Sequence, residues 1–323
     1  MAFFEPAWAH GASPALVLLA ALLVEALWPL PPQSVARSIH PLALIGRLTG
    51  ELERRLDRAR RNEATRILRG AGLLIVFVGL AGLAGWLVQL WTRANPLGWI
   101  AEAALVALML EQRGTIARAA RVARALKENK GAAAAYREQF GRASGRKLAQ
   151  DADRHAVARA ALEACATSFA AHAVGAVLWY AVLGLPGLFV HRVAGAMSTA
   201  ARSSEKAGFG LAIHRFEAAF TAIPARLAVP ILALAALAVP GASASRAVAV
   251  SFAGHKNVPG INDGWPVGAV AGALDLALGG PKPWVGTGTA KAEVRDITRA
   301  RYLLFAGGLV LAAPVAAAAA YLA

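Results

Sequence analysis

The chain has 323 residues, of which 57% are hydrophobic and only 16% are charged, and its mean hydropathy is +0.50. Soluble domains carry about 25% charged residues, so this composition excludes a purely soluble enzyme and a disordered chain. The formal charge of +15 is typical of cytoplasmic loops that face anionic lipid, and it does not call for a nucleic-acid partner.

Apolar runs along the chain predict an all-α fold, a polytopic membrane helical bundle that forms a single domain over residues 1–323. A spanning helix needs ~20 predominantly apolar residues. The first run contains one acid, Glu25, and lacks a basic leader and a cleavage site, so it is expected to be a retained helix and not a signal peptide. About six spans are predicted, near residues 14–30, 71–92, 97–111, 169–190, 226–241 and 302–322.

Two features modify these spans. The pair Asn95-Pro96 separates the second run from the third, which predicts a hairpin with a very short turn. Pro186, between Gly184 and Gly187, predicts a kinked or re-entrant piece in the fourth run, because proline interrupts helical hydrogen bonding.

The basic segments indicate how the chain faces the membrane. Residues 47–69 and 113–130 place Arg and Lys at helical spacing, which predicts amphipathic helices in the membrane interface. The positive-inside rule assigns both to the cytoplasm. The six-span count then puts residues 191–225 outside although they too are basic, which leaves open whether both apolar blocks that flank this loop cross fully.

The sharpest local motif is Asn262-Asp263-Gly264-Trp265-Pro266, a polar turn that leads into a helix of small residues and ends at Gly279-Gly280-Pro281. Glycine lets a backbone approach another group closely. The turn is therefore predicted to line a ligand site. The single cysteine, Cys165, excludes an internal disulfide and a zinc site built on cysteines.

This motif resembles the C-terminal signature of the CobD/CbiB family, membrane proteins of cobalamin biosynthesis, in which Ser-Pro-Asn-Ala-Gly-Trp-Pro leads into a Gly-rich helix that ends in Gly-Gly-Pro. Further matches follow in the family's order, so the resemblance spans roughly residues 15–285. They are His40-Pro41-Leu42 with Ile45-Gly46 and Leu52-Glu53, Ser144-Gly145-Arg146-Lys147, Arg159-Ala160-Ala161-Leu162-Glu163, Gly184-Leu185-Pro186-Gly187, Phe209-Gly210 and Ile223-Pro224-Ala225-Arg226.

The resemblance implies a ligase-type enzyme, an adenosylcobinamide-phosphate synthase, which joins adenosylcobyric acid to aminopropanol phosphate through an amide. It implies ATP and Mg²⁺ as cofactors, because a carboxylate activated as an acyl phosphate requires metal ligands and cations that bind phosphate. It also implies an integral protein of the bacterial inner membrane, in contact with lipid and with other cobalamin-pathway enzymes as candidate partners, and without nucleic acid.

Carried onto this sequence, the resemblance predicts Glu217 and Glu163 as catalytic residues, and Glu217 also as a magnesium ligand. An ion pair with Arg159, four residues earlier, is the structural alternative for Glu163. His172 fits a ligand of corrinoid cobalt, although a packing histidine is the favoured reading. The predicted substrate-binding residues are Asn262, Asp263, Gly264, Trp265, Arg146 and Arg226, with the two arginines placed to hold phosphate.

The sequence departs from the family pattern at several acidic and amide positions. The family's Asp-Asp-x-x-Asn ahead of Pro-x-Arg becomes Glu217-Ala218 with Thr221 at the Asn position, and the Asp of Gly-Arg-Asp becomes Lys147. The alternative function is therefore a non-catalytic paralogue that binds a corrinoid or a partner protein in the membrane. A transporter is disfavoured because the spans carry few paired charges. Further losses fall at Val193 to Ser198, Thr167-Ser168 and Ala171-His172.

Overall fold

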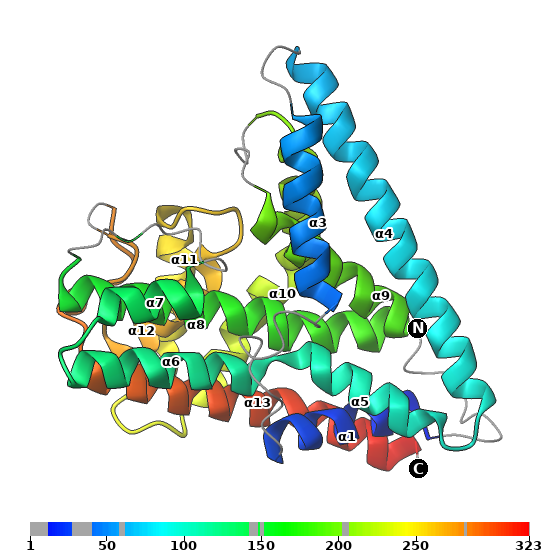
Figure 1. The fold of residues 1–323 in the computed structure, drawn as a ribbon. Coiled ribbons are helices and arrows are strands. Elements are labelled where there is room, and N and C mark those ends of the chain that lie inside the picture. Colours follow the sequence, from blue (N-terminus) through cyan, green and yellow to red (C-terminus); the bar gives the residue numbers. More distant parts are fainter. Residues whose placement is uncertain are drawn as a thin grey trace. The chain divides into compact units, whose positions relative to one another are not determined.

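The computed structural model describes residues 12–27, 41–57, 62–141, 148, 152–201, 207–280 and 283–322. These residues form helices, and the β-pairing recorded among them is limited to isolated bridges in the segment before the last helix, so the all-α prediction is confirmed (Figure 1). The elements are α1 (Pro14–Leu27), α3 (Pro41–Leu56), α4 (Glu63–Ala94), α5 (Gly98–Leu110), α6 (Gln112–Lys127), α7 (Ala132–Phe140), α8 (Arg154–Ser168), the π-helix η2 (Phe169–Val174), α9 (Gly175–Ala200), α10 (Leu211–Ala236), α11 (Ala244–Gly254), the 3₁₀ turn η3 (His255–Asn257), α12 (Gly264–Leu274) and α13 (Val294–Leu322).

Four helical stretches are long and apolar enough to cross a membrane, and they contain all or most of the predicted spans 71–92, 169–190, 226–241 and 302–322. The other two predicted spans correspond to α1 with 14 residues and α5 with 13. At 1.5 Å per residue each is about 20 Å long, short of the ~30 Å hydrocarbon core. The four stretches are Glu63–Ala94, Arg154–Ala200, Leu211–Ala236 and Val294–Tyr321.

Two predicted segments differ in the structure. The amphipathic helix expected over 47–69 is divided: α3 ends at Leu56, and α4 begins after Asn62, whose side chain accepts a hydrogen bond from the Thr65 amide at 3.0 Å. Such a cap satisfies a free N–H of the first turn, which is why the new helix starts there. The loop expected over 191–225 is mostly helix, because α9 continues to Ala200 and α10 begins at Leu211.

The described residues fall into two compact units, and the first comprises Met1–Leu110, Gly175–Phe220 and Val315–Ala323. Here α4 packs along α9. The predicted kink at Pro186 is confirmed: Gly184 is non-helical, with φ 68° and ψ −154°. The amide of Leu185 donates a hydrogen bond to Gln89 Oε1 at 2.8 Å, so a polar side chain of α4 satisfies the backbone at the kink.

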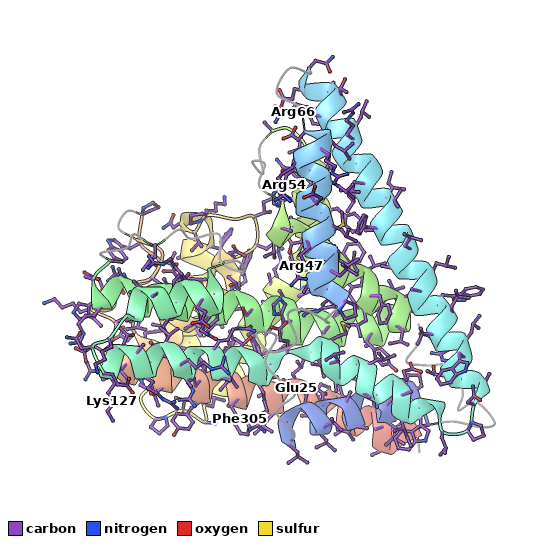
Figure 2. All side chains as sticks on the ribbon, viewed as in Figure 1. Glu25, Arg47, Arg54, Arg66, Lys127 and Phe305 are labelled. Atoms are coloured by element: carbon purple, nitrogen blue, oxygen red, sulfur yellow. The ribbon has the colours of Figure 1, made fainter. Side chains whose placement is uncertain are left out.

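A buried carboxyl group joins three helices of this first unit. Glu102 on α5 is 4% exposed. Its Oε1 lies 2.7 Å from the Tyr180 hydroxyl of α9, and its Oε2 lies 2.7 Å from the Thr92 hydroxyl of α4. Hydrogen bonds between buried polar groups are needed to offset their desolvation, so this cluster fixes the register of α4, α5 and α9. On α3, Figure 2 shows Arg47 and Arg54 projecting outward, and both are exposed.

The second unit comprises Glu111–Val174 and Thr221–Pro314. In it α6, α7 and α8 pack side by side, and α11 packs on α12 (Figure 1). The amphipathic helix predicted over 113–130 is confirmed as α6, which buries Val122 and Leu126 and exposes Arg124 and Lys127 (Figure 2). This unit also contains the polar turn at Asn262.

Candidate functional site

Close contact between α11 and α12 positions the turn at Asn262. Gly264, Gly268 and Gly272 recur every four residues, which places them on one face of α12. A Cβ on Gly268 would lie 2.6 Å from Ser251 Cα, and a Cβ on Gly272 would overlap the backbone of Arg246. Small residues at such positions let two helix backbones approach each other. The glycines of the predicted small-residue helix therefore face a neighbouring helix.

Gly264, predicted to bind substrate, lies at the start of this contact. A Cβ there would overlap the carbonyl of His255, so the 3₁₀ turn η3 covers the position that a side chain would occupy. Tight packing against η3 therefore explains why residue 264 is a glycine.

Asn262 ties the turn to α10. Its Nδ2 donates a hydrogen bond to Thr221 Oγ1 at 2.9 Å, and Asn262 and Thr221 are 6% and 9% exposed. A buried amide or hydroxyl without a partner costs about 1–3 kcal/mol, so this pair fixes the turn against the helix. Thr221 occupies the position at which the family pattern has Asn. The contact joins two segments that the sequence separates by 41 residues.

Trp265 is the centre of an aromatic and cationic cluster. Its ring stacks on His255, with centroids 4.1 Å apart and an interplanar angle of 16°, and meets Phe252 edge-on at 5.2 Å. The guanidinium carbon of Arg226 lies 5.1 Å from the ring centroid, within the range of a cation–π interaction. Arg226 Nη1 also donates to the carbonyl of Ala222 at 2.7 Å.

The cluster brings two of the predicted site residues, Trp265 and Arg226, into contact and adds His255, which the sequence did not point to. Trp265 is 9% exposed, whereas Arg226 is exposed, so a planar, permanently charged donor group stands at the surface beside a buried ring. Such a group suits phosphate or carboxylate. His255 was missed because a single histidine in a polar turn has no ligand spacing that would mark it.

Glu163 contacts the segment that follows α12. Its Oε1 accepts a hydrogen bond from the amide of Gly279 at 2.9 Å. Arg159, four residues earlier on α8, donates from Nη1 to the carbonyl of Ala290 at 2.5 Å and places its guanidinium carbon 5.3 Å from the Trp284 ring centroid. Both side chains of the Arg-Ala-Ala-Leu-Glu motif therefore bind the glycine-rich segment after α12.

The contacts described above for this cluster do not include the remaining predicted site residues, some of which lie outside the described residues. Glu217 belongs to α10 but falls in the first unit, whereas Asn262 falls in the second. Asp263 directly follows Asn262 and is half-buried at the start of α12. Arg146 lies outside the described residues, as do Lys147 and His40.

His172 lies in η2, and its Nδ1 is 3.5 Å from Glu111 Oε2. Glu111 separates α5 from α6 with a φ of 54°, and its Oε1 also pairs with Arg118 Nη1 at 2.5 Å. The histidine is thus held in a charged cluster of its own unit, which agrees with the favoured interpretation of a packing residue.

The donor set at the turn is small for a metal. Among the residues that the structure describes, no group of three His, Cys, Asp or Glu side chains lies close enough to hold a metal ion. Mg²⁺ is commonly bound by one or two carboxylates together with phosphate oxygens of a substrate. Asp263 is the carboxylate that adjoins Asn262, so the turn itself offers Mg²⁺ one carboxylate and would need substrate oxygens to complete its coordination.

Together, four helices long and apolar enough to cross a membrane define a polytopic α-helical membrane protein, and its buried polar turn beside an arginine and a tryptophan is a candidate site. The family model described as CobD/Cbib protein matches residues 18–304. The chain belongs to the CobD/CbiB family.

Several curated relatives carry the name cobalamin biosynthesis protein CobD. The one from a Sinorhizobium species is 32% identical over 291 residues, covering 88% of each chain. The one from Rhizobium meliloti is 30% identical over 318 residues, covering 94% of this chain and 96% of the relative. The relative from Rhodobacter capsulatus is 29% identical over 271 residues, covering 80% and 83%. No solved structure matches the chain.

Proposed function

We propose that the chain acts in cobalamin biosynthesis as an adenosylcobinamide-phosphate synthase, which forms an amide between adenosylcobyric acid and aminopropanol phosphate at the expense of ATP. One observation carries the proposal: two segments that bear family motifs meet in space. Thr221 and Arg226 on α10 contact Asn262 and Trp265 respectively, in a chain that matches the family over 18–304.

The residues of this cluster suit the substrates of such a reaction. The exposed guanidinium of Arg226 binds a phosphate group, here that of aminopropanol phosphate. Asp263 accepts a proton from the attacking amine, which must lose one as the amide forms. Asn262 holds the turn in place through its bond to Thr221. ATP with Mg²⁺ would supply the phosphoryl group that activates the corrinoid carboxylate as an acyl phosphate, and phosphate would leave as the amine forms the amide.

The proposed place of the reaction is the bacterial inner membrane. The apolar outer residues of α4 face lipid, among them Leu80 and Leu87, which are 60% and 52% exposed. The cationic surface of α6 faces the cytoplasm, as the positive-inside rule requires. ATP and the other enzymes of the pathway are then on the same side as this basic helix, and no nucleic acid takes part.

A second candidate function is a non-catalytic paralogue that binds a corrinoid or a partner protein. It is favoured by the scarcity of metal donors within the described ranges and by Thr221, which engages Asn262 at the position where the family pattern has Asn. Binding without turnover is the behaviour that this candidate predicts.

Purified protein in detergent distinguishes the two candidates. With ATP, Mg²⁺, adenosylcobyric acid and aminopropanol phosphate, the synthase proposal predicts an amide product detectable by mass spectrometry, at least tenfold less of it with Asn262→Ala, and undiminished product with Glu128→Ala, an exposed residue after α6. A folded preparation that forms no product contradicts the synthase. Thermal stabilisation by the corrinoid in that preparation would then support the paralogue.

A further inference from the structure

Three side chains on one face of α8 hold the backbone of the segment after α12 at Gly279, Ala290 and Ala292. His155, Arg159 and Glu163 follow one another at intervals of four residues, which aligns them along the helix. The contacts of Arg159 and Glu163 are described above, and His155 Nδ1 lies 2.9 Å from the carbonyl of Ala292. Each of the three side chains thus bonds to a main-chain group. The hold of α8 on this segment therefore does not depend on which side chains the segment carries.

The held segment in turn packs on the turn that carries the site. Asn257 Nδ2 donates to the carbonyl of Trp284 at 3.0 Å. Leu278, directly before Gly279, exchanges two backbone hydrogen bonds with Val285, directly after Trp284, at 2.9 and 2.8 Å. His255, two residues before Asn257, is the residue that stacks on Trp265. A continuous series of contacts therefore leads from Glu163 through Gly279 to the ring at the centre of the site.

The bond made by Glu163 is the first link in this series. A carboxylate that accepts from a backbone N–H makes a charge-assisted hydrogen bond, about twice as strong as a neutral one. Gly279 has a φ of 84°, a conformation that favours glycine, and the next residue, Gly280, is covered by the Trp284 ring. These two positions require glycine, and glycine leaves a free chain many accessible conformations. Contacts from outside the segment are therefore needed to keep it in one of them.

We propose that Glu163 is a positioning residue, which with Arg159 fixes residues 279–280 and 283–285 against residues 254–258 and so sets His255 and Trp265 in the site. Its carboxylate serves as an acceptor for a backbone amide and does not bind metal or transfer a proton. The effect on turnover rests on the proposed synthase function, whereas the effect on the segment does not.

The test compares Glu163→Gln, which keeps an acceptor oxygen, with Glu163→Ala, which removes it, and uses Glu128→Ala as the control on an exposed glutamate. Hydrogen exchange of a peptide covering 276–292 is expected to be about 10- to 100-fold faster in Glu163→Ala, as for the loss of a hydrogen bond to a charged group. It is expected to be at most about tenfold faster in Glu163→Gln, whose neutral bond is about half as strong, and to change less than about threefold in the control.

Turnover supplies the second measurement. Glu163→Ala is expected to raise KM at least fivefold, while Glu163→Gln restores KM to within about twofold of the wild type and leaves the Mg²⁺ dependence unchanged. Equal losses of kcat in Gln and Ala variants, with unaltered exchange of 276–292, would overturn the proposal and identify a catalytic or metal-binding carboxylate. If Glu163→Ala does not accumulate, Glu163→Gln decides through its Mg²⁺ dependence: loss of the charge at a metal ligand would raise the Mg²⁺ concentration required, whereas the positioning role predicts an unchanged requirement. If the wild-type protein shows no turnover, the proposed synthase function is refuted. The hydrogen-exchange measurement then tests the positioning role of Glu163 by itself.

Discussion

Replacing Gly268 by alanine tests the close crossing of α11 and α12. The new Cβ would lie 2.6 Å from Ser251 Cα and 3.1 Å from Ser251 N, both of them backbone atoms that no side-chain rotation can move away. Ordinary contacts between such atoms require about 3.5–4 Å, so the two helices must separate by about 1 Å. Overpacking of this kind costs about 1–3 kcal/mol. The separation also strains the bond between the Ser251 hydroxyl and the Trp265 carbonyl, now 3.1 Å long.

Thermal unfolding in detergent measures this cost, and Gly79→Ala provides the matched control. Gly79 lies within α4, and nothing stands within 4 Å of its Cβ position, so alanine there gains helix propensity without a clash. For a chain of this size each kcal/mol corresponds to roughly 1.5 °C in Tm, because the entropy of unfolding grows with chain length. We therefore expect Gly268→Ala to lower Tm by about 1–5 °C and Gly79→Ala to leave it unchanged or raise it. A Gly268→Ala protein as stable as the control would refute the described helix crossing.

Three further variants test other contacts. Thr221→Val removes the acceptor of Asn262 and is expected to lower the free energy of unfolding by about 1–3 kcal/mol. Thr221→Ser keeps the hydroxyl and should retain most of the wild-type stability. Equal losses of stability in the two variants would contradict the hydrogen bond. Glu102→Ala leaves the buried Tyr180 hydroxyl without its acceptor and should destabilise the protein by about 2–4 kcal/mol. Glu102→Gln should destabilise it clearly less. A Glu102→Ala protein as stable as the wild type would show that the cluster is not buried. Hydrogen bonds from Arg54 and then Arg55 lower the pKa of Glu51 from 4.5, so the carboxylate stabilises the fold above that pH and loses this effect as the pH falls through its lowered pKa. The difference in Tm between wild type and Glu51→Gln should accordingly shrink as the pH falls below 4.5 and vanish below the lowered pKa of Glu51, and a difference that grows on acidification would contradict the assigned pairing.

Hydrophobic length predicted the four long helices and also the end of α5, because the apolar run 97–111 closes at the charged Glu111 and α5 ends at Leu110. The left-handed conformation of Glu111, with a φ of 54°, was not predicted, because no glycine marks that position. The break between α3 and α4 had a readable signal in Asn62, a residue type that favours helix N-caps. That signal was outweighed by the continuous helical spacing of the surrounding arginines.

The candidate site was predicted in its residues and not in its contacts. Asn262, Trp265 and Arg226 were found through the family resemblance, but their approach to one another depends on how α10 meets the turn before α12, which is a tertiary property. The bond from Asn262 to Thr221 joins residues 41 positions apart, beyond the reach of local periodicity. The role of Glu163 could not be read from spacing because its partner is a backbone amide.

Genetic complementation tests the central claim most directly. The chain is expressed in a bacterium that lacks its own adenosylcobinamide-phosphate synthase, and growth that depends on cobalamin made from cobyric acid is measured, with protein in the membrane fraction checked by immunoblot. The account predicts growth with the wild-type chain and at least tenfold poorer growth with Asn262→Ala at equal abundance. Absence of growth, with the wild-type chain folded and present in the membrane, would contradict the synthase and favour the non-catalytic paralogue.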